Sequence, residues 1–324
     1  MIEDHGQLIE LITGYQAAAV VTAAWNLGVF AAVGDEAVGA DELARGLGAD
    51  TRSLEALLQA LVELGLLRRE EGGFAATPFG ILRLGRDAEL GLVIEKEAVF
   101  ARAWQDLEQV VREGRPVLAP WKERLRTEPE RARSFLSALD VLARLTGPDL
   151  RSLPSLAPGR LVLDVGGGLG SYARVLVSAG SRVVLVDLPE VAGWAREALA
   201  DLAPDVCRVL PADVELEGLP TGIDADAALV SHLLHDLPPD ACRRVLRAVG
   251  EALVPGGTVV VNDFARDAGP GPFGPLFDIM MRVETGGSAY LVSEIQGFLQ
   301  DTGFQEVHRL AFPPPLTVLE ARKG

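Results

Sequence analysis

The strongest constraint on the fold is an apolar run that ends in an acid and passes directly into glycines. It reads Leu161-Val162-Leu163-Asp164-Val165-Gly166-Gly167-Gly168-Leu169-Gly170-Ser171. Its branched residues and single charge are typical of a buried central strand. The glycines allow a sharp turn and a close approach of the backbone to a ligand, and the helix that follows presents free N–H groups. The stretch therefore predicts a strand, a glycine loop and a helix that together bind a nucleotide-like group.

A second acid makes this prediction more specific. The glycines follow the spacing G-x-G-x-G, with Ser171 where a dinucleotide fingerprint would have its third glycine. The next expected strand, 182–188, carries Asp187 near its end, about twenty residues beyond the first glycine, where an acid can accept from both hydroxyls of a ribose. The alternative is a glycine turn in an ordinary α/β core with an N-capping acid, and the position of Asp187 makes that alternative less favourable.

The remainder of the second half alternates between strand and helix patterns, which predicts a mostly parallel sheet. Strands are expected at 160–166, 182–188, 206–212, 226–233 and 258–264, and helices near 169–180, 190–202 and 239–253. The tail differs, because Pro313-Pro314-Pro315 joins two further strands, 305–312 and 316–321. So short a connection makes them antiparallel neighbours.

The first half predicts helices followed by a hairpin. Residues 7–33 form an amphipathic pattern rich in small residues, further helices open at Asp41 and Thr51, and two short strands flank Glu70-Glu71-Gly72. This order is typical of a winged helix. The helix that would read DNA carries Arg52, Glu55, Gln59 and Glu63, which do not make a basic face. We therefore do not expect DNA binding.

Composition excludes further classes of function. The net charge of −16 opposes binding to phosphate backbones and to anionic membranes. We find no apolar run long enough to span a bilayer, and the acidic N-terminus lacks the layout of a secretory signal. Cys207 and Cys242 are the only cysteines, which suggests reduced thiols and no metal-ligand cluster. We expect a cytoplasmic protein with no metal, no nucleic-acid partner and no membrane partner.

These motifs resemble the S-adenosyl-L-methionine (SAM) dependent methyltransferases, and more narrowly the small-molecule O-methyltransferases of the caffeic acid and acetylserotonin type. The resemblance covers nearly the whole chain. It is carried by residues 164–170, Val186-Asp187-Leu188-Pro189, Leu234-His235-Asp236-Leu237-Pro238, Pro255-Gly256-Gly257 and Gly286-Gly287.

The resemblance implies an α/β fold in two domains. A Rossmann-like methyltransferase domain, 159–324, would hold a mostly parallel seven-stranded sheet with an antiparallel last strand. A mainly α winged-helix dimerisation domain, 1–110, would precede it, with connecting helices at 111–158. The expected assembly is a homodimer.

The resemblance also implies SAM as the cofactor, with S-adenosyl-L-homocysteine as its product. Asp213, after the third strand, would lie beside the adenine, and Ser231 stands where the family has a lysine that contacts SAM. The cofactor contacts expected on this basis are Asp164, Gly166, Gly168, Gly170, Asp187, Leu188, Asp213, Val214 and Ser231.

His235 follows the fourth strand, at the sheet edge where doubly wound folds bind ligands. The resemblance implies that His235 is the general base, and that Asp263 replaces the glutamate that orients it in the family. Asp236 also suits a helix cap, and His232 is expected to be a packed neighbour. The resemblance implies a pocket for the acceptor molecule lined by Phe100, Trp104, Asp236, Met280 and Glu284, although core packing is the alternative for the apolar residues.

One departure from the family leaves the reaction open. A second orienting glutamate is expected after Gly286-Gly287, and this chain has Ala289 there, so Tyr290 or Glu284 would have to substitute. The first reading is an O-methyltransferase of secondary metabolism that acts on an aromatic or polyketide-like hydroxyl. The second is a SAM-binding relative that methylates carbon or nitrogen, or that does not methylate. A remote third is a winged-helix regulator with a degenerate enzyme domain.

Overall fold

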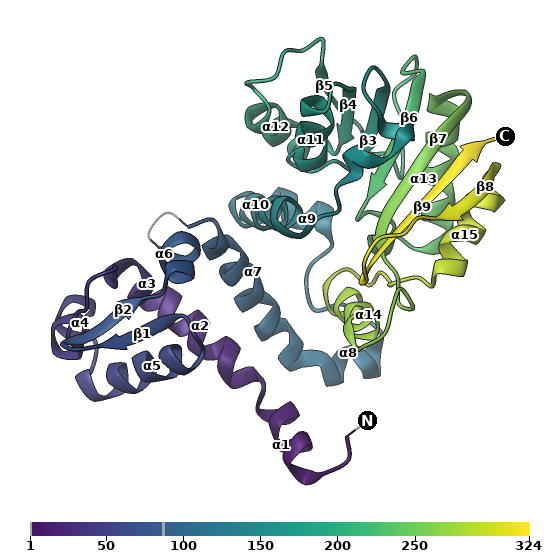
Figure 1. The fold of residues 1–324 in the computed structure, drawn as a ribbon. Helices are drawn as coiled ribbons and strands as arrows, with labels where there is room; N and C mark the ends of the chain where they lie inside the picture. The colour runs from purple at the N-terminus through teal and green to yellow at the C-terminus, as the bar shows by residue number, and fades with distance from the viewer. Residues whose placement is uncertain (1, 86–87) are drawn as a thin grey trace. The chain divides into compact units, whose positions relative to one another are not determined.

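The computed structural model describes residues 2–85 and 88–324. The chain folds into two compact units, Met1–Phe100 and Ala101–Gly324, and the larger unit contains the glycine loop and the His235 segment (Figure 1).

A seven-stranded sheet forms the centre of the larger unit, in the spatial order β5-β4-β3-β6-β7-β9-β8. The strands are β3 (Leu161–Val165), β4 (Arg182–Asp187), β5 (Cys207–Pro211), β6 (Ala225–Ser231), β7 (Leu253–Phe264), β8 (Phe304–Arg309) and β9 (Leu316–Lys323). Strands β3 to β7 pair in parallel, whereas β9 runs antiparallel to both β7 and β8. The predicted fold class is therefore confirmed. Strand β7 begins earlier than the expected residue 258, because Leu253 already pairs with Ala225.

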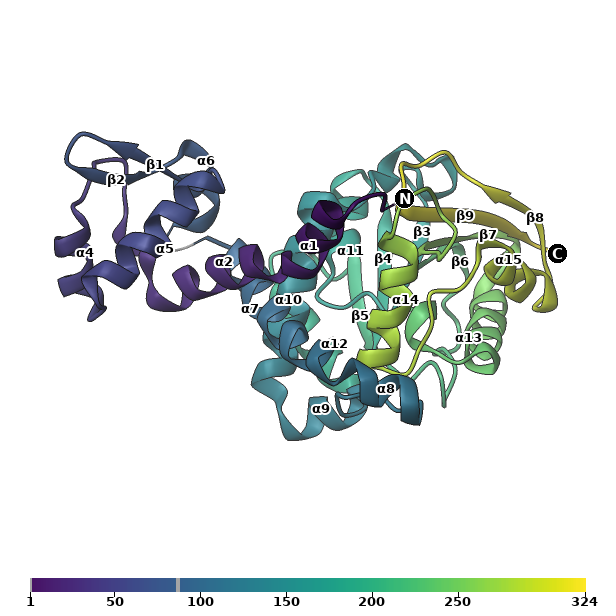
Figure 2. The same ribbon diagram turned by 90° about the horizontal axis from the view of Figure 1, so that it is seen from below.

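Helices cover both faces of this sheet, because successive side chains of each buried strand point to opposite faces. On one face, Val162 packs in a core with Ala173 and Leu176 of α11 (Ser171–Ser178). On the other, Leu163 packs in a core with Leu246 of α13 (Pro239–Ala252). The helix α12 (Pro189–Ala198) contributes to the first core, and α15 (Val292–Asp301) contributes to the second. Figure 2 shows α13 and α15 side by side.

The remaining helices of this unit include α14 (Phe273–Glu284), η4 (Leu234–Asp236), η1 (Trp104–Asp106), α8 (Leu107–Glu113), α9 (Trp121–Thr127) and α10 (Pro129–Thr146). Prolines stand at the first position of α10, α12 and α13. At that position the ring fixes a helical φ angle and the missing N–H would have had no helical partner.

The smaller unit packs α4 (Ala40–Leu47) and α5 (Thr51–Glu63) against the hairpin of β1 (Leu67–Glu70) and β2 (Gly73–Ala76). Its other helices are α1 (His5–Thr13), α2 (Tyr15–Leu27), α3 (Val29–Ala32), α6 (Pro78–Leu84) and α7 (Leu90–Ala103), of which α7 runs into the next unit. The single helix expected over 7–33 is divided, because Gly28 adopts a left-handed φ of 79° that ends α2.

The segment His5–Leu27 leaves most apolar side chains of its first half exposed, whereas Val20, Ala24 and Trp25 pack in the core of the smaller unit. It spans 23 residues, and an 18-residue stretch of it has a mean hydropathy of 1.3 with 6% of that stretch buried, so length and composition alone would let it cross a membrane. The expectation that no segment is long enough was wrong, because Gly14 keeps a helical φ of −56° and the two helices run on. Leu11 and Ile12 are 65% and 63% exposed. A helix that packs against another protein has the same character.

Candidate active site

The glycine loop joins β3 to α11 in a conformation that needs glycine. Gly166, Gly168 and Gly170 have φ angles of 68°, 55° and 89°, which side-chain-bearing residues rarely adopt. A Cβ at Gly167 would lie 2.7 Å from Oδ2 of Asp164, so the loop has no room there for a side chain. The backbone thus forms a tight cradle at the carboxyl end of β3, where a ligand can approach closely.

Asp164 is a buried carboxyl group beneath this loop. Its side chain belongs to a residue that is 1% exposed, and neither oxygen has a hydrogen-bond partner among the residues that the structure describes. Burial, helped by the negative charge of Asp187, raises the pKa of Asp164 to about 7. Burying a carboxylate without a partner is costly, and a positively charged ligand group would remove that cost.

Asp187 ends β4 beside the loop. Its Oδ2 accepts from the N–H of Gly168 at 2.8 Å, and its Oδ1 accepts from that of Leu188 at 2.7 Å. Burial raises the pKa of Asp187 to about 6, although the two backbone donors oppose this shift. The two backbone N–H groups therefore fix the carboxylate, and its oxygens keep further lone pairs for the hydroxyl donors of a ligand.

His235 and Asp263 form a buried pair at the same edge of the sheet. His235 lies in η4 after β6, and Asp263 lies near the end of β7, a parallel neighbour of β6. Nδ1 of His235 and Oδ1 of Asp263 are 2.5 Å apart, and the two residues are 8% and 2% exposed. The loop that follows α14 holds the backbone here, because Ser288 donates to the carbonyl oxygen of His235 at 2.8 Å. A Cβ at Gly287 would collide with that oxygen, which explains this glycine.

Neighbouring carboxylates control the charge of His235. Burial alone would lower the pKa of this imidazole, but Asp263 and Asp236 outweigh burial and raise the pKa to about 9. Asp236 lies on the opposite side of the ring, with its Oδ2 3.8 Å from Nε2 of His235. Burial would raise the pKa of Asp263, but the imidazole of His235 outweighs it and holds that pKa below its usual value.

His232 lies next to this pair. Its Nδ1 is 4.0 Å from Oδ1 of Asp263, and Asn262 approaches its Nε2 at 3.3 Å. Two imidazoles and a carboxylate so placed are the groups that bind transition metals, and their ligand atoms lie within 4.8 Å of one another. The 2.5 Å separation of His235 and Asp263 is that of a direct hydrogen bond, shorter than two ligands of one ion would allow.

Aromatic side chains from the end of β7 and from α14 surround the two imidazoles. The ring of Phe277 meets that of His235 edge to face at 5.0 Å, and Phe264 lies 4.7 Å from His232. Phe273 stacks on Phe277 at 5.9 Å, and Met280 packs against the cluster of Phe277 and Phe264. This wall is suited to a flat apolar molecule.

The position of the missing glutamate is apolar. Ala289 is fully buried, and the hydroxyl of Tyr290 donates to the carbonyl oxygen of Leu237 at 2.6 Å. Glu284 instead contributes to the raised pKa of His235 and forms an ion pair at 3.3 Å with Arg124. Of the two substitutes considered from the sequence, only Glu284 is among the groups that shift the pKa of His235. Arg124, on α9, was not expected, because no local pattern links it to residues so distant in the sequence.

The other expected cofactor residues lie along the same edge. Asp213 pairs with Lys122 at 2.6 Å, a partner that no local sequence pattern indicated. The hydroxyl of Ser231 lies 2.9 Å from Nδ2 of Asn262 inside the sheet. Leu188 and Val214 are half-buried against apolar clusters.

The two aromatic residues expected in the acceptor pocket fall in different units. Phe100 is buried in the smaller unit, 4.7 Å from Nζ of Lys96. Trp104, in the larger unit, packs with Leu107 and Val283.

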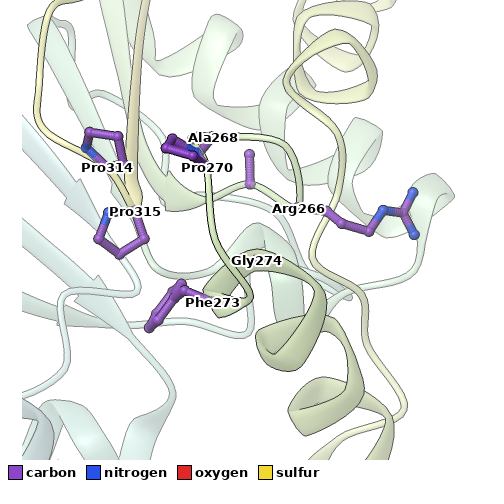
Figure 3. A pocket seen from close by; sticks show the side chains of 9 residues that line it. Arg266, Ala268, Pro270, Phe273, Gly274, Pro314 and Pro315 are labelled. Carbon is purple, nitrogen blue, oxygen red and sulfur yellow. The ribbon is translucent and has the colours of Figure 1, made fainter. Parts of the chain in front are cut away.

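A small pocket of about 120 Å³ lies between the segment after β7 and the loop before β9, and it shares only Phe273 with the described residues of the aromatic wall (Figure 3). Pro270, Phe273, Pro314 and Pro315 line it, and the side chain of Arg266 extends away from the proline rings to pair with Asp278 at 3.2 Å. None of the described residues that line it is a carboxylate or a histidine, so we do not assign the reaction to this pocket.

A parallel sheet with an antiparallel strand near its edge, a glycine loop after its central strand and an acid after the next strand defines a SAM-dependent methyltransferase. The ligand fits the residues present. The loop requires glycine, Asp187 offers oxygens to a ribose, and the partnerless Asp164 suits the positive charge of SAM.

Comparison with known proteins identifies the family. Residues 9–84 match an O-methyltransferase dimerisation domain, and residues 104–305 match an O-methyltransferase domain. The chain is 32% identical to the 3-hydroxy-5-methyl-1-naphthoate 3-O-methyltransferase of Streptomyces sahachiroi, over 95% of this chain and 92% of that protein. It is 30% identical to the acetylserotonin O-methyltransferase of Mus musculus, over 99% and 89%. Human N-acetylserotonin methyltransferase in complex with SAM has the same fold, with a TM-score of 0.86, 25% identity and 99% coverage of both chains.

This protein therefore belongs to the O-methyltransferase family. It is an enzyme, and SAM is its cofactor.

Proposed function

We propose that this enzyme methylates a hydroxyl group of an aromatic or polyketide-like small molecule in secondary metabolism, with His235 as the general base. The observation that carries the proposal is the buried pair of His235 and Asp263 at the sheet edge that also holds the glycine loop. The aromatic wall around His235 supports a flat acceptor. Relatives named for a hydroxynaphthoate and for acetylserotonin support the same acceptor class.

The chain's own groups would hold the cofactor in this proposal. SAM, when bound, supplies an electrophilic methyl group on a positively charged sulfur. The loop N–H groups approach it closely, Asp187 accepts from the ribose hydroxyls, and Asp164 compensates positive charge. Asp213 accepts from the adenine amino group, and Leu188, Val214 and Ser231 complete the contacts.

His235 would remove the proton from the acceptor hydroxyl through Nε2, while Asp263 holds Nδ1 and stabilises the cation that forms. A phenol has a pKa of about 10 and a free histidine about 6.5, so transfer to an ordinary imidazole costs about 5 kcal/mol. With a pKa of about 9 for His235, the remaining gap of about one unit costs about 1.4 kcal/mol. Asp263 and Asp236 together thus make His235 strong enough to act on a phenol.

Activity with defined acceptors tests the proposal. We expect the enzyme, given SAM with a deuterated methyl group, to label the oxygen of a hydroxylated aromatic such as 3-hydroxy-5-methyl-1-naphthoate or N-acetylserotonin. Mass spectrometry and NMR of the product would locate the methyl group. Label on carbon or nitrogen alone, or SAM bound without transfer to any member of a broad phenol panel, would contradict O-methylation.

The same assay has an expected pH dependence. A general base must be neutral, so kcat/KM should rise with pH and level off above about 9, the pKa of His235 in the free enzyme. Asp263→Asn removes the charge that raises this pKa, so its midpoint should move to lower pH while the maximal rate falls. If the midpoint of the pH profile is unchanged in Asp263→Asn, the group that titrates in the profile is not His235.

We further propose that residues 1–110 build a homodimer. The match to a dimerisation domain over 9–84 supports this, as do the exposed apolar side chains of the first helices: Leu8, Ile9, Leu11, Ile12 and Tyr15. A second subunit is a better cover for them than a bilayer, because a chain with a net charge of −16 is repelled by anionic membranes and by nucleic acid. A cytoplasmic location fits the two free cysteines, Cys207 and Cys242.

Light scattering at micromolar concentration tests the dimer. An obligate interface buries more than about 2,000 Å² and is largely apolar, so a charge at its centre should disrupt it. We expect the wild type to be a dimer and Ile12→Glu to be a monomer. Leu216→Glu, at a site that is 73% exposed in the larger unit, should remain dimeric. A wild-type monomer would overturn the proposal.

A further inference from the structure

His232 is held in an unfavourable backbone conformation next to the base. Its φ is 51°, in the left-handed region where histidine is tolerated only locally. Its N–H donates to the carbonyl oxygen of Asn262 at 2.8 Å, and its ring lies 4.7 Å from that of Phe264. The surroundings thus fix both the backbone and the imidazole at a cost, and such strain is concentrated at functional sites.

Asn262 favours one tautomer of His232. Nδ2 of Asn262 lies 3.3 Å from Nε2 of His232, and an amide N–H group placed there favours the tautomer in which Nε2 is unprotonated and Nδ1 carries the proton. The same Nδ2 group lies 2.9 Å from Oγ of Ser231 and 3.2 Å from the hydroxyl of Tyr172 on α11. Asn262 is fully buried, so this amide is a rigid support that also contacts the helix after the glycine loop.

The protonated Nδ1 of His232 faces the carboxylate that holds the base. It is 4.0 Å from Oδ1 of Asp263, the same oxygen that contacts His235, and it has no hydrogen-bond partner among the described residues. Burial lowers the pKa of His232 to about 4, against the opposing effect of Asp263, so this imidazole stays neutral. At 4.0 Å this is a charge–dipole contact and not a hydrogen bond, and the neutral imidazole stabilises the negative charge of Asp263 without competing with His235 for a proton.

We propose that His232, supported by Asn262, is a positioning residue that holds Asp263 on Nδ1 of His235. The inference rests on the proposed role of His235 as base. Its physical content is a chain of contacts from Asn262 through His232 and Asp263 to His235, in which each group fixes the orientation of the next.

Two amide substitutions test the roles of the two ring nitrogens of His232 one at a time. In His232→Asn the amide nitrogen can take the place of Nδ1, and asparagine also tolerates a left-handed φ. In His232→Gln the amide reaches the place of Nε2 and leaves the side towards Asp263 empty. We expect kcat to fall about 3- to 10-fold in His232→Gln, within the range of interaction energies between neighbouring groups of one network, and to recover in His232→Asn, with KM for SAM unchanged in both.

Glu306 offers a matched control for the backbone, because it has a φ of 50° on the edge strand β8. Glu306→Gln and Glu306→Asn should differ in thermal stability by the same amount as His232→Gln and His232→Asn. The two Glu306 variants should not differ in kcat. In an Asp263→Asn background the difference between His232→Gln and His232→Asn should vanish, since the carboxylate that both act on is gone. Equal kcat for the two His232 variants in the wild-type background would overturn the inference.

An NMR measurement distinguishes failure of the positioning role of His232 from failure of the proposed function. The chain has four histidines, so the imidazole signals can be assigned by single substitutions. We expect the Nδ1 proton of His235 to be resolved downfield in the wild type and in His232→Asn, and to broaden or shift in His232→Gln. If these NMR signals behave as expected but His235→Ala keeps its turnover, only the proposed function is refuted. An unchanged His235 signal in His232→Gln would refute the positioning role alone.

Discussion

Replacing His235 by alanine should lower kcat by about 10²–10⁴, the usual contribution of a positioned general base. The acceptor hydroxyl must lose its proton as the methyl group is transferred, and His235 is the buried base whose pKa, about 9, is close to that of a phenol. Steady-state rates with saturating SAM and a phenolic acceptor would measure the effect. The affinity for SAM should hardly change, because His235 is assigned to the acceptor.

One control variant and one comparison variant accompany this experiment. His308→Ala removes an exposed histidine from β8 and should leave kcat unchanged. Asp263→Asn should do less harm than His235→Ala, because it misorients the base without deleting it. If turnover survives in His235→Ala, the acceptor arrives ionised or is not a hydroxyl, and methylation of carbon or nitrogen becomes the better reading.

The sequence predicted the parts of this molecule that follow from local pattern. Strand β3 and the glycine loop were evident because a buried strand and a left-handed turn each demand particular residues at consecutive positions. The antiparallel β9 followed from a three-proline connection too short for a crossover. Asp187 and His235 could be placed at one edge because parallel strands bring their carboxyl ends together.

The remaining features depend on contacts between distant parts of the chain. Arg124 meets Glu284, and Lys122 meets Asp213, through the packing of α9, which no periodicity encodes. The left-handed φ of His232 has no local signal either, because its sequence neighbours read as an unbroken strand. Such contacts change the charge and orientation of site residues, so the sequence indicated the groups of the site without their arrangement.

Replacing Asp187 by alanine should weaken SAM binding by about 10²–10⁴. The ribose would lose two charge-assisted hydrogen bonds of roughly 1.5–3 kcal/mol each, and the loop would lose the acceptor that fixes the N–H of Gly168. Calorimetric titration of the purified protein with SAM measures this without an acceptor. Asp240→Ala, which removes an equal charge from a side chain that is 91% exposed, should bind SAM like the wild type.

The raised pKa of Asp187 also predicts how SAM affinity depends on pH. Because burial raises that pKa to about 6, the carboxylate needed by the ribose becomes protonated in the free protein as the pH falls below 6. SAM affinity should therefore decline between pH 7 and pH 5 in the wild type, and the Asp187 part of that decline should be absent in Asp187→Ala. Asp164, with a pKa of about 7, titrates nearby and accounts for the decline that the variant retains. Equal SAM affinity in wild type and Asp187→Ala at pH 7 would remove Asp187 from the site, and binding of NAD in place of SAM would remove the cofactor assignment altogether.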